Sequence, residues 1–412
     1  MKFLKISLLI LIVFFICSFF GCKFCQAQNN SKAESEIEVF YASAEKTVEE
    51  QLRDNVYEQI DKLDITLFDS FILSLDDDTY QVFGNRSFLE TVKSMLDGEF
   101  DSGIDTIFGI ILNMFFSYFL GFLPVIFTII IVSILSGLLT NLKSEFLGKN
   151  TGDIIHFVCY LAIILILSTS IFQIITLTQK TIVNMRDFMN LIFPVILTLM
   201  TASGGTASTS FLQPLTAILS SGITEIIVGV IIPIFIVLTV LTVVSNLSSN
   251  IKLTRLAGFF KSCAQWIIGI CFTIFIAFLA IQGIIASTTD GISIRAAKYA
   301  ISHSIPIVGG YIKDGFNLVL GSCVLIKNAV GVTGMLLVLG MALVPIIKML
   351  VFSLSLKLTS GIVEPVTDKR ISTLIHDMSK NITLLLIAVI CVAFMFFLAL
   401  AILIMSSNSV LI

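Results

Sequence analysis

Hydrophobic residues in this sequence come in long runs that are separated by short polar stretches. Five runs are clear, at about residues 107–138, 154–178, 223–245, 265–287 and 381–405. Each is long enough to cross the hydrocarbon core of a bilayer, for which an α-helix needs roughly 20 predominantly apolar residues. The core of a soluble protein would instead show short runs in which apolar and polar residues alternate. The pattern therefore predicts an all-α, polytopic membrane protein.

Two further apolar stretches, 188–222 and 315–356, are interrupted by residues that disturb helices. With them the number of crossings becomes six to eight, and the transmembrane domain, 104–412, is predicted to be broken near 194–214 and 306–345. Irregular backbone at membrane depth survives only where protein or a water-filled cavity satisfies its polar groups. The interrupting residues are Pro194, Gly204, Gly205 and Pro214 in the first stretch, and Gly321, Lys327, Gly331 and Pro345 in the second.

The chain begins with a pattern that is typical of an export signal. Lys2 and Lys5 precede an apolar run at 6–20, and a small-residue cleavage site ends at Ala27. We expect cleavage after Ala27, which makes residues 1–27 a signal peptide. An uncleaved anchor helix and a lipoprotein signal are the alternatives, and an anchor would export the following residues equally well.

Charge divides the chain into two regions, although 56% of its residues are hydrophobic, 13% are charged and its mean hydropathy is +1.01. Residues 28–105 hold 19 acidic and 6 basic residues, whereas residues 106–412 hold 9 and 16. The acidic region, 28–103, is predicted to be extracytoplasmic, with one or two amphipathic helices. It has too few apolar residues for a core of its own, so we expect it to pack on the membrane domain or on another protein. The acidic run at 76–78 predicts a solvated turn, or a site for a divalent cation or basic partner.

Three loops are rich in Lys and Arg, and such loops tend to stay in the cytoplasm. They lie around residues 143–149, 252–261 and 357–380. The first two must be separated by an even number of crossings, which favours a broken or re-entrant hairpin at 188–222. The third requires that 315–356 cross an odd number of times. This scheme places the C-terminus outside the cytoplasm.

Candidate functional residues gather at the interruptions. Residues 201–210 are rich in Thr, Ser and Gly, which favours either close helix packing or a permeation path. Glu225 follows this stretch and either lines a polar pathway or stabilises the free amides of a helix start. A second Pro and Gly-Gly interruption at 305–310 hints at the repeats of transporters, although its spacing differs. The candidates for partner docking or conduit lining are Gly204, Gly205, Glu225, Arg295, Lys298, Pro306, Gly309, Gly310 and Lys313.

Few motifs in the sequence indicate catalysis or ligand binding. The three histidines, His156, His303 and His376, show no ligand spacing, and no nucleophile stands in a recognisable setting. There is no phosphate-binding Gly-rich loop followed by lysine and no clustered basic patch of the kind that nucleic acid requires. The sequence predicts a protein that is not an enzyme, with no cofactor, no metal and no nucleic-acid partner.

Residues 289–302 and 305–315 closely resemble the signature region of the stage III sporulation protein AE family, and residues 323–331 also resemble it. The signal, the acidic region and the order of spans fit the same family, so the resemblance covers essentially the whole chain. It implies a structural subunit of a channel-like complex between mother cell and forespore, located in the mother-cell-derived membrane. The implied partners are the other stage III A-operon membrane proteins and a forespore membrane protein. The implied role is to sustain forespore development after engulfment.

Two other classes of function stay open at this point. A stand-alone secondary transporter is favoured by the paired interruptions and Glu225, and an intramembrane hydrolase is a third class. Arg295, Lys298 and Lys313 flank the second interruption. They suit the docking of a partner, the lining of an opening, or contact with lipid headgroups.

Overall fold

The structure is a computed structural model in which the chain divides into two units, Met1–Gln51 and Leu52–Ile412. The described residues all belong to the second unit. The predicted signal peptide and Pro306 lie outside the described residues. The described residues are 55–60, 66–82, 86–97, 104–146, 149–247, 253–304 and 309–406.

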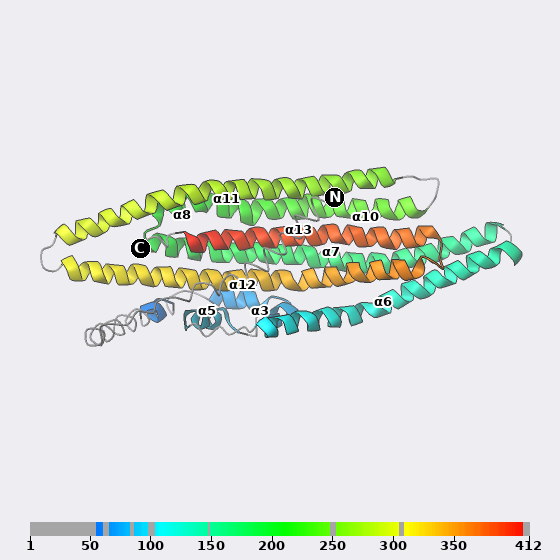
Figure 1. Cartoon of the computed structure of the whole chain (residues 1–412), viewed down its shortest axis with the longest axis horizontal. Coiled ribbons are helices and arrows are strands. Elements are labelled where there is room, and N and C mark those ends of the chain that lie inside the picture. Colours follow the sequence, from blue (N-terminus) through cyan, green and yellow to red (C-terminus); the bar gives the residue numbers. More distant parts are fainter. Residues whose placement is uncertain are drawn as a thin grey trace, which may run out of the picture. The chain divides into compact units, whose positions relative to one another are not determined.

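The described part of the chain is helical and has no strand, so the predicted all-α class is confirmed (Figure 1). The short helices are residues 55–60, α3 (Thr66–Leu73), α4 (Asp77–Val82) and α5 (Phe88–Asp97). The long helices are α6 (Ile104–Phe146), α7 (Lys149–Ala202), α11 (Thr254–Ser304), α12 (Gly309–Val363) and α13 (Lys369–Met405). Between α7 and α11 the chain forms α8 (Thr206–Ala217), the π-helix η2 (Ile218–Ile223), α9 (Thr224–Ile226), the π-helix η3 (Ile227–Ile231) and α10 (Ile232–Leu247).

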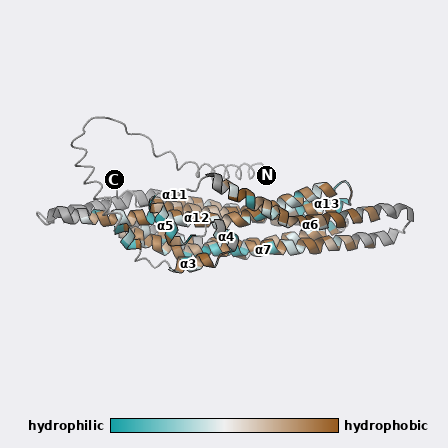
Figure 2. Ribbon diagram, turned by 90° about the horizontal axis from the view of Figure 1, so that it is seen from below, coloured by the Kyte–Doolittle hydropathy of each residue, from teal (hydrophilic) through white to brown (hydrophobic). Residues whose placement is uncertain are grey.

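Six helical stretches within the described residues are long and apolar enough to cross a membrane, which equals the lower limit of the predicted six to eight. The protein is a polytopic membrane protein. Figure 2 shows that hydrophobic residues cover most of the long helices, whereas hydrophilic residues gather around α5. The six stretches are Phe108–Leu139, Phe157–Ala202, Ser221–Leu247, Thr254–Ala280, Gly315–Val363 and Lys369–Met405.

Within the two interrupted apolar stretches, most of the predicted interruptions are wrong, and only the one at Gly204 and Gly205 ends a helix. Helix α7 continues through Pro194 as far as Ala202, and α12 is continuous from Gly309 to Val363 with Pro345 inside it. A proline removes one hydrogen bond from a helix interior, and packing against neighbouring helices can outweigh that loss. In α12 the proline is buried against such neighbours. In α12 the local rule therefore failed where tertiary packing is dense, whereas Pro194 of α7 is exposed.

Helices α12 and α13 form the centre of the bundle. They lie side by side and antiparallel, with α6, α7, α10 and α11 packed around them (Figure 1). In the most apolar windows of these helices, 61% of α12 and 56% of α13 are buried, against 28% of α6 and 22% of α11. The difference identifies α12 and α13 as core helices and α6 and α11 as outer helices.

The helix connections alternate between two ends of the bundle (Figure 1). The α6–α7, α10–α11 and α12–α13 connections lie at one end, here called the basic end because it contains the three loops rich in Lys and Arg. The α7–α8 turn, the facing ends of α11 and α12, and the end of α13 lie at the other, here called the outer end. The alternation agrees with the predicted parity, with two crossings between the first two basic loops and one crossing for α12.

Candidate functional site

The first group of candidate residues forms a sharp turn between α7 and α8. Gly204 has a φ of 90°, which is a conformation that favours glycine. The amide of Gly205 donates to the carbonyl of Met200 at 2.8 Å, and the amide of Gly204 donates to that of Thr201 at 3.0 Å. This pair of bonds is a Schellman motif, which satisfies the last carbonyls of a helix. Both glycines thus serve to end α7 and to turn the chain back.

An open groove of about 550 Å³ lies between α7 and the α8–η2 segment, and we call it the threonine groove. Within it, Thr201 Oγ1 donates to Thr209 Oγ1 at 3.2 Å across the turn. The lining combines hydroxyl and amide groups with apolar side chains, and none of the lining residues is charged. Such a surface suits water or a neutral polar group, because it offers an ion no opposite charge. The lining residues are Asn190, Phe193, Pro194, Leu197, Thr198, Thr201, Thr209, Gln213, Thr216 and Ser221.

Glu225 does not line the threonine groove. It lies in the short helix α9 between the two π-helices, and its side chain is exposed. π-helical turns are rare and often occur at functional sites. A polar pathway was one of the two roles expected for Glu225, and the structure does not bring its side chain into the groove beside residues 201–210.

The second group of candidates lies where α11 ends and α12 begins. Arg295 and Lys298 are in the last turns of α11, and Gly309, Gly310 and Lys313 are in the first turns of α12. Both groups are at the outer end of the bundle, but they are on different helices (Figure 1).

The short N-terminal helices share the core of the membrane domain, which is one of the two arrangements expected for them. Phe68 of α3 stacks on Phe88 of α5, with ring centroids 4.5 Å apart, and both rings are buried. Phe68 also contacts Phe188 of α7 edge to face at 6.3 Å. The amide of Phe88 donates to Asp69 Oδ1 at 3.0 Å. The aromatic rings therefore hold α3 and α5 against α7.

Two residues of the acidic run contact side chains of long helices, Asp76 with α7 and Asp78 with α6. The run is therefore more than a solvated turn. Lys180 Nζ of α7 lies 2.5 Å from Asp76 Oδ1, and the Tyr118 hydroxyl of α6 donates to Asp78 Oδ2 at 2.7 Å. Lys348 Nζ of α12 lies 5.4 Å from the centroid of the Tyr118 ring. We call these five residues the outer polar layer. Within the described residues no cluster of His, Cys, Asp and Glu could hold a metal ion.

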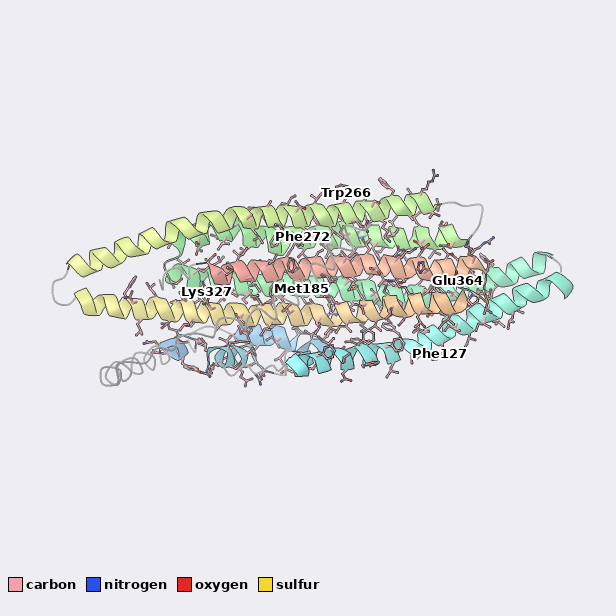
Figure 3. The ribbon with its side chains drawn as sticks, in the orientation of Figure 1. Phe127, Met185, Trp266, Phe272, Lys327 and Glu364 are labelled. Carbon is pink, nitrogen blue, oxygen red and sulfur yellow. The ribbon has the colours of Figure 1, made fainter. Side chains whose placement is uncertain are left out.

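Lys327 was expected to interrupt α12 but instead caps α13. Its side chain is fully buried, and Nζ donates to the carbonyls of Ile404, at 2.9 Å, and of Ser406 (Figure 3). The last carbonyls of a helix lack intrahelical partners and carry partial negative charge, so a cation there is stabilising. The sequence could not show this role, because the partners are 77 and 79 residues away.

Two pairs of serines join α12 to α13. Ser353 and Ser379 each donate to the backbone carbonyl of the other, at 3.1 and 2.8 Å. Ser360 and Ser372 do the same at 2.9 and 3.3 Å. The pairs are seven residues apart on both helices, so they lie on one seam. Hydrogen bonds of this kind hold helices together in a bilayer and here fix the register of α12 against α13.

Comparison with known proteins identifies one family. The family model described as Stage III sporulation protein AE matches residues 86–407, which include α5 and all the long helices. A similar protein, stage III sporulation protein AE of Bacillus subtilis (strain 168), is 28% identical over 281 residues, covering 68% of this chain and 70% of the relative. No solved structure matches the chain. The chain therefore belongs to the stage III sporulation protein AE family, and its role is in sporulation.

Proposed function

We propose that this protein is a multi-pass subunit of a channel- or secretion-like complex between mother cell and forespore, required for endospore development after engulfment. The observation that carries this proposal is the family match over residues 86–407. The candidate membrane spans support a subunit that is embedded in a bilayer.

The protein would lie in the mother-cell-derived membrane, with its basic end in the mother-cell cytoplasm. The excess of Lys and Arg at that end supports this orientation. The outer end, with α3–α5, would then face the forespore across the intermembrane space. Its partners would be the other stage III A-operon membrane proteins and a forespore membrane protein.

A structural role fits better than an enzymatic one. At the outer end, Gly204 and Gly205 end α7, and the basic residues Arg295, Lys298 and Lys313 suit docking to an acidic partner surface. The uncharged threonine groove offers hydrogen bonds without an acid, base or nucleophile among its lining residues.

Deletion of the gene tests the proposal. We expect sporulation to stop after engulfment, with vegetative growth unchanged, and we expect the wild-type gene to restore spore yield. A deletion strain that forms spores at the normal frequency contradicts the proposal.

Charge reversal tests the docking role separately. The double variant Arg295→Glu, Lys298→Glu should reach normal amounts in the membrane but lose copurification with the partner membrane proteins. Arg255→Glu, an exposed residue near the basic end, is the matched control and should keep the partners. Equal copurification by both variants would exclude the outer end of α11 as the docking surface.

The alternative is a stand-alone secondary transporter, which the threonine groove favours because it offers uncharged polar contacts. Such a transporter should move a solute when it is purified alone and reconstituted in liposomes. A subunit should need its partner proteins for any transport.

A further inference from the structure

Three helices are far longer than a bilayer is thick. The 55 residues of α12 rise about 82 Å at 1.5 Å per residue, and α7 and α11 have 54 and 51 residues. The hydrocarbon core is about 30 Å thick, and a helix tilted by about 40° crosses it in about 40 Å. About half of α12 must therefore lie outside the hydrocarbon. Exposed side chains show which half.

Helix α7 changes character along its length. Its exposed large apolar residues run from Ile154 to Phe172 and then stop. The exposed residues after Phe172 are polar or small, or proline. They are Gln173, Thr176, Lys180, Asn190, Pro194, Thr198, Thr201 and Ala202. A surface of the first kind suits lipid, and a surface of the second kind suits water.

Two other helices also expose large apolar residues toward the basic end. On α11, whose side chains are described as far as Ala280, the exposed large apolar residues run from Leu256 to Ile276, and on the part of α12 nearer the basic end they run from Leu350 to Ile362. Trp266 of α11 and Phe127 of α6 point outward, whereas Met185 of α7 is enclosed (Figure 3). The described stretch of α11 rises about 30 Å, which is enough to cross a hydrocarbon core.

On α7 and α12, the outer polar layer lies close to the point where the run of exposed large apolar residues ends. From Phe157 to Lys180, α7 rises about 34 Å, and from Tyr118 to Leu139, α6 rises about 31 Å. The outer polar layer thus lies about one hydrocarbon thickness from the basic end. Charged and aromatic groups at such a depth are typical of a membrane interface. Helix α6 also exposes large apolar residues beyond the layer, from Phe108 to Phe116, within about 15 Å of it. These first turns of α6 fit the headgroup region.

Beyond the layer, most large apolar residues of α12 and α13 are enclosed by protein, whereas Leu67 and Leu73 of α3 and Ile218 of η2 are exposed. Helix α13 exposes no large apolar residue before Met405 at its end, and on α12 only Val319, Leu325 and Val332 are exposed among the described residues beyond the layer. These three are single residues, not a continuous patch. Helices α3–α5 cover part of this half.

We propose that lipid surrounds only the half of the bundle between the outer polar layer and the basic end, and that the other half stands in water. The water-exposed half comprises the outer parts of α7, α12 and α13 together with α3–α5 and α8. The threonine groove then opens to water and does not line a path through the hydrocarbon.

Fluorescence quenching on one helix tests this placement. Single cysteines would replace Leu165 or Phe172 in the apolar part of α7, and Thr198 or Thr201 in the outer part, in the full chain without its native cysteines. All four side chains are exposed, so the fold should tolerate the changes. Each cysteine would carry a small fluorophore, with the protein reconstituted in phosphatidylethanolamine–phosphatidylglycerol vesicles.

We expect nitroxide-labelled lipids to quench positions 165 and 172 several-fold more strongly than positions 198 and 201. Aqueous iodide should show the opposite order. Gln213→Cys, which places the probe on α8, should behave like positions 198 and 201. Strong lipid quenching at 198, 201 and 213 would place the outer half inside the bilayer and overturn the proposal, whatever the sporulation phenotype.

Discussion

At the residue scale, Lys327 shows how one side chain can stabilise the end of a distant helix. Its ammonium group is enclosed and donates to two terminal carbonyls of α13. Removing a donor and leaving buried acceptors without a partner costs about 1–3 kcal/mol. Lys327→Met keeps the length of the side chain but loses these bonds.

We expect Lys327→Met to lower the free energy of unfolding by about 1–3 kcal/mol in detergent micelles. Lys357→Met is the matched control on the same helix, because Lys357 is exposed, and it should change stability by less than about 0.5 kcal/mol. Equal stability of the two variants would contradict the capping role.

Gly137 sets a close approach between α6 and the turn that joins α12 to α13. A Cβ added there would overlap the carbonyl oxygen of Val366, and Thr367 Oγ1 donates to the carbonyl of Ser133 at 2.9 Å close by. Gly137→Ala should therefore destabilise the protein by about 1–3 kcal/mol, measured by chemical unfolding. Gly121→Ala on the same helix has open space around its Cβ and should be neutral or slightly stabilising.

At the element scale, the serine pairs predict a coupling between α12 and α13. Ser353→Ala and Ser379→Ala should each destabilise the bundle, and the double variant should cost less than their sum by about 0.5–1.5 kcal/mol. Unfolding of the four species of this cycle gives the coupling. Ser360→Ala with Ser379→Ala, which are not partners, should be additive, and coupling of equal size there would refute the pairing.

Length and apolarity made the long helices predictable, because a bilayer demands about 20 apolar residues from any helix that crosses it. The end of α7 at Gly204 was also visible, since few residues other than glycine adopt that conformation. The continuity of α12 was not visible, because Pro345 follows a local rule that tertiary packing overrides. The partners of Asp76 and Asp78 are 104 and 40 residues away, so no local pattern could reveal them.

At the scale of the whole molecule, α3–α5 depend on the membrane helices for their core. Phe68→Ala removes a buried ring between α5 and α7, and such a change costs about 3–5 kcal/mol. We expect faster hydrogen exchange across residues 66–97 and little change in α13. Leu67→Ala, at the exposed neighbouring position, should leave exchange unchanged. Unaltered exchange in the Phe68 variant would mean that α3–α5 are held by other contacts.

The uninterrupted α12–α13 pair limits how the two sides of the membrane can communicate. The helices are pinned to each other by hydroxyl pairs near the basic end and by Lys327 near the outer end. Because α12 is one continuous helix, a force on its outer end would be transmitted along its length. It would reach the turn beside Glu364 as a translation or a rotation of the α12–α13 pair as a whole.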